Sequence, residues 1–319
     1  MKKPRYLMGI DGGGSKTVAL AADETGRVLG RGAAGASNFQ VVGRQAAQTA
    51  ILTAMAAAAA EAGIAPQPAL SALCLGLSGV DRPGERAVFQ QWAAELHPAC
   101  PHVLIANDAE LVLAAGTPAG WGLALICGTG AIVYGRSPAG RLARADGWGH
   151  LLGDEGSGYA IGLAALRAVM RAYDGRGPTT ALSEALLARW ALATVPDLVA
   201  RVYRELSGKH EIAALARTVD ATAAAGDPVA QQILADAGRE LAQSAQAVVQ
   251  RLELTGQIPC ALAGGVAVGS RLVRDEFLAA AESLGLTLAP VAPVDEPALG
   301  AIALARSATQ GQATASAMV

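Results

Sequence analysis

The stretch Asp11-Gly-Gly-Gly-Ser-Lys-Thr17 decides the fold, because it joins two segments that both have the pattern of strands. Residues 5–10 precede it and residues 17–23 follow it, and each is a short apolar run of the kind found in buried strands. A P-loop would need Gly-Lys-Ser/Thr followed by a helix, and a dinucleotide-binding turn would also lead into a helix. The sequence therefore predicts a glycine-rich β-hairpin.

The same pattern occurs a second time. The turn Gly128-Thr129-Gly130 begins 116 residues after Gly12, and the glycine of the following turn recurs at Gly140, 114 residues after Gly26. Each set reads as a three-stranded meander followed by helices and further strands. Chance recurrence of turn residues is the alternative explanation. We favour an α/β chain of two related domains with a cleft between them.

Residues 155–255 have mostly helical apolar spacing. Single helices are predicted over Val195–Leu206 and over Glu211–Ala225. Asp227-Pro228 predicts the start of a long helix, with Asp227 as N-cap and Pro228 at the first helical position.

Length and composition agree with two domains. The 319 residues are 52% hydrophobic, which is ample for a sizeable core. The net charge of −2 lacks the basic surplus of nucleic-acid binders. The most apolar run, residues 50–60, is about half the roughly 20 residues of a membrane-spanning helix. No secretory signal pattern follows the N-terminus. We expect a soluble, cytoplasmic protein with no nucleic-acid or membrane partner.

The two glycine turns are candidate phosphate-binding sites, because successive glycines let backbone N–H groups converge on an anion. The residues concerned are Gly12, Gly13, Gly14, Ser15, Lys16 and Thr17 in the first turn and Gly128, Thr129 and Gly130 in the second. Asp11 is placed to hold Mg²⁺ through water. Plain tight turns and a solvated Lys16 are the alternatives.

Asp108 is the candidate base. It follows the predicted strand His102–Ala106, and α/β folds bind ligands at the carboxyl ends of parallel strands. There it would accept a proton from an attacking hydroxyl. The alternative is that Asn107 or Asp108 caps the next helix.

Three further polar or glycine-rich segments suit small ligands. The loop with Gly147, Trp148, Gly149 and His150 suits a sugar, which offers hydroxyls and an apolar face, and Asn38 is another polar position. Asp154 is either a ligand residue or, like Glu155, a cap for the following helix. His150 is either a base or a packed loop residue. Gly264-Gly265 would let an adenine or ribose lie on the backbone, or else forms a helix-entry turn.

Together these motifs resemble the actin/Hsp70/sugar-kinase superfamily and, within it, the N-acetylglucosamine kinase branch of the BadF/BadG/BcrA/BcrD ATPase family. The resemblance runs from about residue 7 to residue 305. It rests on Asp11–Thr17, Ser37-Asn38, Gly76-Leu-Ser-Gly79, Asn107-Asp108-Ala109, Gly128-Thr-Gly130, Gly147-Trp-Gly-His150, Gly153-Asp-Glu-Gly-Ser157, Ala225-Gly-Asp-Pro228 and Ala263-Gly-Gly265.

The resemblance implies two ribonuclease H-like domains of the actin-like ATPase fold, residues 1–116 with 295–319 and residues 117–294, the second with a helical insertion. ATP and Mg²⁺ would bind between them, held by the two glycine hairpins, Ala225, Gly264 and Gly265. Asp108 would match the family's catalytic base. The amino-sugar contacts would be Asn38, Asp108, Gly147, Trp148, Gly149, His150 and Asp154. A homodimer is also implied.

The expected function is ATP-dependent phosphorylation of N-acetylglucosamine, or a closely related amino sugar, at the 6-hydroxyl. A glucosamine or N-acetylmuramic acid kinase, an ATPase switch that activates a partner protein and a regulatory sugar binder are the alternatives. Ala131 and Ile132 stand where animal N-acetylglucosamine kinases have a polar Ser-Asn pair near the sugar. The choice of sugar therefore stays open.

Overall fold

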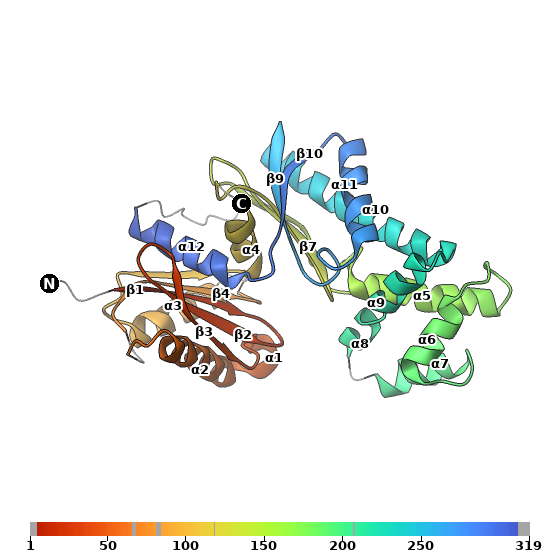
Figure 1. The fold of residues 1–319 in the computed structure, drawn as a ribbon, viewed down its shortest axis with the longest axis horizontal. Coiled ribbons are helices and arrows are strands. Elements are labelled where there is room, and N and C mark those ends of the chain that lie inside the picture. The colour runs from red at the N-terminus through yellow and green to blue at the C-terminus, as the bar shows by residue number, and fades with distance from the viewer. Residues whose placement is uncertain (1–4, 66–67, 81–83, 118, 207, 312–319) are drawn as a thin grey trace. The chain divides into compact units, whose positions relative to one another are not determined.

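The computed structural model describes residues 5–65, 68–80, 84–117, 119–206 and 208–311. The described residues form two compact units, one within Met1–Trp121 and Val294–Met318 and the other within Gly122–Pro293. Each unit is built on one five-stranded sheet with helices packed against it (Figure 1). No helix in the described part of the chain is long and apolar enough to cross a membrane.

The described part of the first unit contains five strands and five helices. They are β1 (Tyr6–Gly12), β2 (Thr17–Ala22), β3 (Val28–Ala34), α1 (Phe39–Val42), α2 (Arg44–Glu61), β4 (Leu70–Leu77), α3 (Glu85–Leu96), β5 (His102–Ala106), α4 (Asp108–Gly116) and, from the end of the chain, α12 (Ala298–Thr309).

The second unit carries the helical segment between its third and fourth strands. Its elements are β6 (Gly122–Cys127), β7 (Ala131–Arg136), β8 (Leu142–Asp146), α5 (Gly158–Tyr173), α6 (Leu182–Trp190), α7 (Asp197–Ala200), the π-helix η1 (Arg201–Glu205), α8 (Lys209–Ala213), α9 (Ala216–Ala224), α10 (Pro228–Leu252), β9 (Gln257–Ala263), α11 (Arg271–Ser283) and β10 (Thr287–Pro293).

The two sheets have the same topology. The first has the order β3-β2-β1-β4-β5 and the second β8-β7-β6-β9-β10. In each sheet the first three strands in sequence form an antiparallel meander. The fourth strand then pairs in parallel with the first, and the fifth pairs in parallel with the fourth. Gly26 and Gly140 occupy equivalent turns with φ of 90° and 82°, values that favour glycine. The predicted hairpins, internal repeat and α/β class are confirmed.

Helices cover both faces of the first sheet. Along β1 the side chains alternate, so Met8 packs with Ile51 of α2, whereas Leu7 packs with Ile302 of α12. Because both faces are covered, every residue of β4 is buried. This explains why the strand reads as a continuous apolar run and why its polar neighbours gather at its end.

Several helix boundaries differ from the sequence prediction. Val195–Leu206 is not one α-helix: α7 follows Pro196 and passes into η1. Glu211–Ala225 is divided, because the Leu215 N–H donates to the Ile212 carbonyl and this tighter turn ends α8 before α9 begins. The short α1 was not predicted; Asn38 caps it by accepting a hydrogen bond from the Gln40 N–H.

The predicted cap of α10 is confirmed and gives the first testable prediction. Asp227 accepts hydrogen bonds from the N–H groups of Ala230 at 2.8 Å and Ala181 at 2.7 Å. We expect Asp227→Ala to lower the free energy of unfolding by about 1–3 kcal/mol, because both donors lose their partner. Asp227→Asn should lose less, because its one amide oxygen can still accept from the Ala230 N–H, although the Ala181 N–H then loses its acceptor. Denaturant titration of the three proteins measures this, and an Ala variant as stable as wild type would contradict it.

Candidate functional site

The first unit gathers polar groups at the carboxyl ends of three adjacent parallel strands. Asp11 lies near the end of β1, Ser78 follows β4 and Asp108 follows β5. The Ser78 N–H donates to the Gly12 carbonyl at 2.9 Å, and the Ser78 hydroxyl donates to Asp108 Oδ2 at 2.9 Å. These three residues come together because β1, β4 and β5 are neighbours in the sheet.

Asp108 does not cap α4. Asn107 is the cap: its side chain accepts from the Glu110 N–H at 2.8 Å, and Glu110 in turn accepts from the Asn107 N–H. Asp108 Oδ1 accepts from the Ala109 N–H at 2.9 Å. The capping function is therefore separate from the Asp108 carboxyl, which is oriented by Ser78 and by the start of the helix.

Asp11 is a partly buried carboxyl near a second carboxyl, that of Asp108. Burial and, after it, the negative charge of Asp108 raise the pKa of Asp11 to about 6, whereas Lys16 acts to lower it. Two carboxyls with this little compensating charge are a suitable environment for a divalent cation, which hard oxygen ligands bind well.

The first hairpin has a packed base and an open tip. A Cβ at Gly12 would lie 2.4 Å from Ser37 Oγ, whereas one at Gly14 would meet no atom within 4 Å. Gly14, Ser15 and Lys16 are exposed. Thr17 is fully buried, and its hydroxyl donates to the Gly35 carbonyl at 2.7 Å. Its side chain ties the hairpin to the residue that follows β3 and is not exposed to a ligand, whereas the tip is.

Ser37 and Asn38 lie directly on this hairpin. Their backbone N–H groups both donate to the Gly13 carbonyl, at 3.0 and 3.1 Å. Asn38 Oδ1 accepts from the Gln40 N–H, so the amide NH₂ is the group that would meet a ligand. Among the described residues, the buried Ser37 hydroxyl has no hydrogen-bond partner.

In the second unit the glycine turn lies on the N-terminus of a helix. The Gly158 N–H of α5 donates to the Gly128 carbonyl at 2.8 Å, and the Tyr159 N–H donates to the Thr129 carbonyl at 3.3 Å. The Thr129 side chain is exposed. A Cβ at Gly128 would lie 3.7 Å from the Gly265 nitrogen, so the two glycine segments predicted from the sequence are neighbours.

Asp154 is buried beneath this turn. It is 5% exposed, its Oδ1 accepts from the Ala131 N–H at 3.4 Å, and a Cβ at Gly130 would lie 2.8 Å from its Oδ2. The alternative that Asp154 or Glu155 caps α5 is wrong, because Ser157 is the cap and accepts from the Ala160 N–H. Asp154 instead supports the shape of the turn.

Asp146 organises the 147–154 loop and was missed by the sequence analysis. Its Oδ1 accepts from the N–H groups of Gly147 and Asp154, both at 2.7 Å. The signal for it in the sequence is an acidic residue directly after the strand predicted over residues 141–145, the third strand of the second meander.

Burial raises the pKa of Glu155, and the neighbouring Asp146 carboxyl raises it further.

The two aromatic side chains of this loop differ in accessibility. Trp148 is 62% exposed, with the Arg144 guanidinium 4.8 Å from its ring centre. His150 packs edge-on against Tyr159 with ring centres 4.8 Å apart. Trp148 is therefore available to a ligand, and His150 is held by packing.

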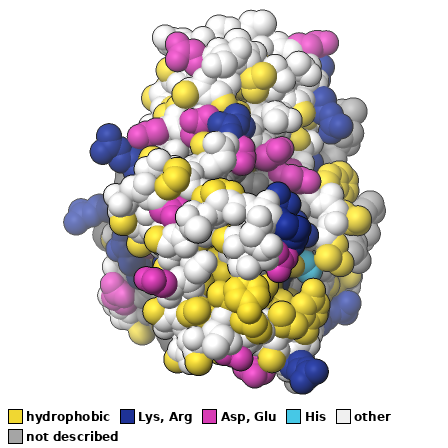
Figure 2. Space-filling view, turned by 90° about the vertical axis from the view of Figure 1, so that its right-hand side faces the viewer, with side chains coloured by type: hydrophobic (Ala, Val, Ile, Leu, Met, Phe, Trp, Pro, Cys, Tyr) yellow, Lys and Arg dark blue, Asp and Glu magenta, His cyan; other side chains and the backbone are white. Residues whose placement is uncertain are grey.

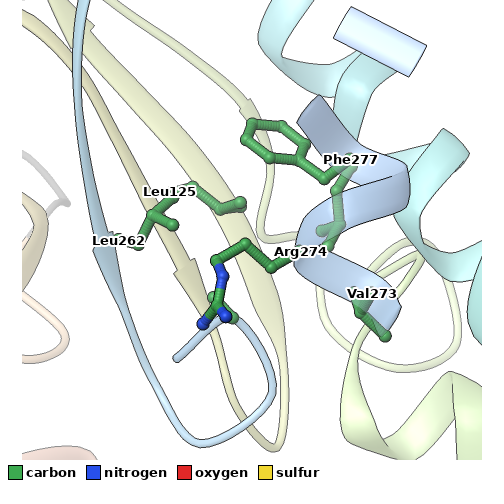
Figure 3. A pocket seen from close by; sticks show the side chains of 7 residues that line it. Leu125, Leu262, Val273, Arg274 and Phe277 are labelled. Atoms are coloured by element: carbon green, nitrogen blue, oxygen red, sulfur yellow. The ribbon is translucent and has the colours of Figure 1, made fainter. Parts of the chain in front are cut away.

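The loop after Gly265 is anchored from two sides. Ser270 caps α11, and its hydroxyl donates to Asp220 of α9. The exposed Ala225 directly follows α9. Arg274 Nη1 donates to the Val268 carbonyl at 3.0 Å. Figure 3 shows Arg274 beside apolar side chains, and the space among the lining residues is too small to admit water. This region supports the loop and is not itself a ligand site.

Gly264 gives a second prediction. Its φ is +91°, and a Cβ there would lie 2.3 Å from the Cys127 carbonyl oxygen, whereas one at Gly265 would meet nothing within 4 Å. Gly264→Ala should cost about 2 kcal/mol or more of stability, from backbone strain and the clash. Gly265→Ala is the matched control and should keep the melting temperature of wild type. Calorimetry of both variants checks this; equal melting temperatures would contradict it.

The duplicated 3-2-1-4-5 sheets, each with a glycine hairpin at the same place, define a two-domain α/β protein of the actin-like ATPase class. The chain belongs to the BadF/BadG/BcrA/BcrD ATPase family, whose sequence profile matches residues 8–305. The predicted family is thereby confirmed.

Named relatives point in the same direction. The chain is 35% identical to an N-acetylmuramic acid/N-acetylglucosamine kinase of Clostridium acetobutylicum, over 95% of this chain and 99% of that protein. It is 34% identical to an N-acetyl-D-glucosamine kinase of Dictyostelium discoideum, over 81% and 84% of the two chains. A solved structure from Chromobacterium violaceum, described as a candidate N-acetylglucosamine kinase, has a TM-score of 0.71 at 30% identity and covers 94% of this chain and 98% of its own.

Proposed function

We propose that this protein is an ATP-dependent kinase that phosphorylates N-acetylglucosamine, or a closely related amino sugar, at the 6-hydroxyl. The observation that carries the proposal is the Asp108 carboxyl, which is fixed by Ser78 and the start of α4 at the carboxyl end of β5, next to Asp11. The names of the relatives from Clostridium and Dictyostelium support the substrate class.

Asp108 acts as general base in this proposal. The sugar hydroxyl donates its hydrogen bond to Asp108 and loses its proton to that carboxyl as the oxygen attacks the γ-phosphorus of ATP. The Ser78 hydroxyl donates to Asp108 Oδ2 at 2.9 Å and so orients the carboxyl. The oxygen–phosphorus bond to ADP breaks as the new one forms, so the products are ADP and the sugar phosphate.

The glycine hairpin of each unit serves the phosphates of ATP. Gly14 and Ser15 at the first tip and Thr129 at the second are exposed, and backbone N–H groups with a nearby hydroxyl suit anionic oxygens. Gly264, Gly265 and Ala225 are proposed for adenosine, and the exposed Gly265 surface beside Gly128 fits a flat group.

Asp11 fits Mg²⁺, because it is a partly buried carboxyl near the Asp108 carboxyl, and Lys16 offsets this negative charge only in part. When bound there through water, Mg²⁺ would supply charge neutralisation on the transferring phosphate. The remaining proposed sugar contacts are Asn38, Gly147, Trp148, Gly149, His150 and Asp154. Of these, Trp148 offers an exposed apolar surface, and the Asp154 contribution is through the shape of the turn.

The direct test is ADP release from Mg-ATP by purified protein, with and without N-acetylglucosamine. We expect strong stimulation by the sugar and a sugar 6-phosphate as product, identified by NMR. Slow ADP release that no sugar stimulates would contradict the kinase and favour an ATPase switch that acts on a partner protein.

N-acetylmuramic acid is the second candidate substrate. The relative from Clostridium is named for both sugars. Here Ala131 is buried and Gly147 packs on Ile132, so this part of the site is apolar. A panel of N-acetylglucosamine, N-acetylmuramic acid and glucosamine, compared by kcat/KM, ranks them. The proposed homodimer is tested separately by sedimentation velocity.

A further inference from the structure

A cavity lies in the helical segment of the second unit, among α5, α7 and η1. Its volume is about 510 Å³, within the range of small-molecule sites. The lining residues are Leu163, Leu166, Arg167, Met170, Arg171, Arg176, Leu198, Val199, Val202 and Tyr203. All are apolar or aromatic except the three arginines, and none of these described lining residues is a carboxylate.

The three arginines around the cavity differ in their partners, and Arg171 Nη2 donates a hydrogen bond to the Arg176 carbonyl at 3.2 Å. Arg176 pairs with Asp174 at 2.6 Å. Arg167 and Arg171 are four residues apart on α5, where like charges disfavour the helix. Neither has an ion-pair partner among the residues that the structure describes. An anion bound between them would remove this repulsion.

Apolar side chains around the cavity reach the surface. Val199 is 51% exposed and Tyr203 is 83% exposed. Figure 2 views the molecule from the side that carries α6 and α7, and hydrophobic side chains gather in its lower part with Lys and Arg side chains nearby. A ligand that covered these groups would gain from burial of apolar surface.

We propose that this cavity binds a small amphipathic anion, with an apolar body against Leu166, Met170 and Val202 and one carboxylate, sulfonate or phosphate group against Arg167 and Arg171. The charge of the cavity selects this occupant. A two-fold contact with a second copy would bring the unpaired arginines of both copies onto one interface, which is unfavourable unless acidic groups meet them.

The test uses 8-anilinonaphthalene-1-sulfonate, which has an aromatic body and one sulfonate, and its neutral analogue N-phenyl-1-naphthylamine. Fluorescence titration is performed on wild type, Arg167→Glu/Arg171→Glu and Arg217→Glu. Arg217 is an exposed arginine on α9 that does not line the cavity, so its variant is the matched control for charge. Val199→Asp, at an exposed lining position, places a carboxylate at the cavity without altering the core.

We expect wild type and Arg217→Glu to bind the sulfonate probe saturably. The double variant and Val199→Asp should bind this probe at least tenfold more weakly. Wild type should bind the neutral analogue at least tenfold more weakly than the sulfonate probe. Dodecanoate should displace the probe, and dodecyltrimethylammonium should not. ADP release should remain as in wild type in all variants, since none lies in the proposed kinase site.

Three results would overturn the proposal. One is sulfonate-probe affinity that the charge reversal leaves unchanged. Another is equal binding of the neutral analogue. The third is a wild-type dimer that excludes the probe and dissociates on charge reversal, seen by sedimentation velocity, because the face would then be a subunit interface.

Discussion

Asp108→Asn is expected to lower kcat by about 10²–10⁴-fold, the contribution usual for a general base. The amide keeps the shape of the carboxyl and can still accept from the Ser78 hydroxyl, but it cannot take up the proton of the sugar hydroxyl. The change should leave α4 intact, because the cap is made by Asn107 and Glu110. The measurement is steady-state ADP release at saturating ATP and sugar.

The matched control for Asp108→Asn is Asp23→Asn. Asp23 is an exposed acid in the β2–β3 turn of the same unit, where it accepts from the Thr25 hydroxyl at 2.6 Å. This variant should keep the kcat of wild type. A well-folded Asp108→Asn protein with kcat within about threefold of wild type would show that Asp108 is not the base, since a lost base costs far more.

Asp11→Asn is expected to make the metal-free protein more stable while impairing the enzyme. The pKa of Asp11 is about 6 against an ordinary 3.8, because burial and the Asp108 charge oppose ionisation. Between these two pH values the folded protein holds a proton that the unfolded chain releases, so wild type loses stability as pH rises through this window. Above pH 6 the free energy of unfolding of wild type is lower by roughly 3 kcal/mol for this reason. Asparagine does not ionise, so the variant does not lose this stability.

Denaturant unfolding in EDTA at pH 4 and pH 8 measures this difference. The gain of Asp11→Asn over wild type should be small at pH 4 and largest at pH 8. With Mg²⁺ and ADP added, the melting temperature of wild type should rise more than that of the variant, and kcat/KM of the variant should fall. Asp11→Asn no more stable than wild type at pH 8 would contradict the buried-carboxyl assignment. Equal responses to Mg²⁺ and ADP would contradict the metal assignment alone.

Local features of this fold could be predicted from the sequence because they depend on residues close together in the chain. The two hairpins follow from apolar runs around Gly12 and Gly128, and the α10 cap follows from Asp227-Pro228. The repeat was visible because equivalent turns need the same glycines. The division at α8 and α9 was not visible, since a single change of hydrogen-bond pattern near Leu215 leaves the apolar spacing almost unaltered.

The candidate site was predicted in part. The sequence placed Asp11, Asp108 and the glycine turns at strand ends, and the structure brings Asp11 and Asp108 within electrostatic reach of each other. It also places Gly264 and Gly265 against the second hairpin. The sequence did not reveal that Thr17 is a buried part of the hairpin or that Asp146 holds the 147–154 loop.

The class of fold, its duplication and the kinds of chemical group at the strand ends thus follow from the residue pattern alone. Which of these groups meet depends on how the strands and helices pack. Ser78 reaches Asp108 across 30 residues because β4 and β5 are neighbours in the sheet, and Gly264 is required because β9 lies beside β6. Strand order is set by the burial of both faces of the sheet, a property of the whole unit that no short segment carries.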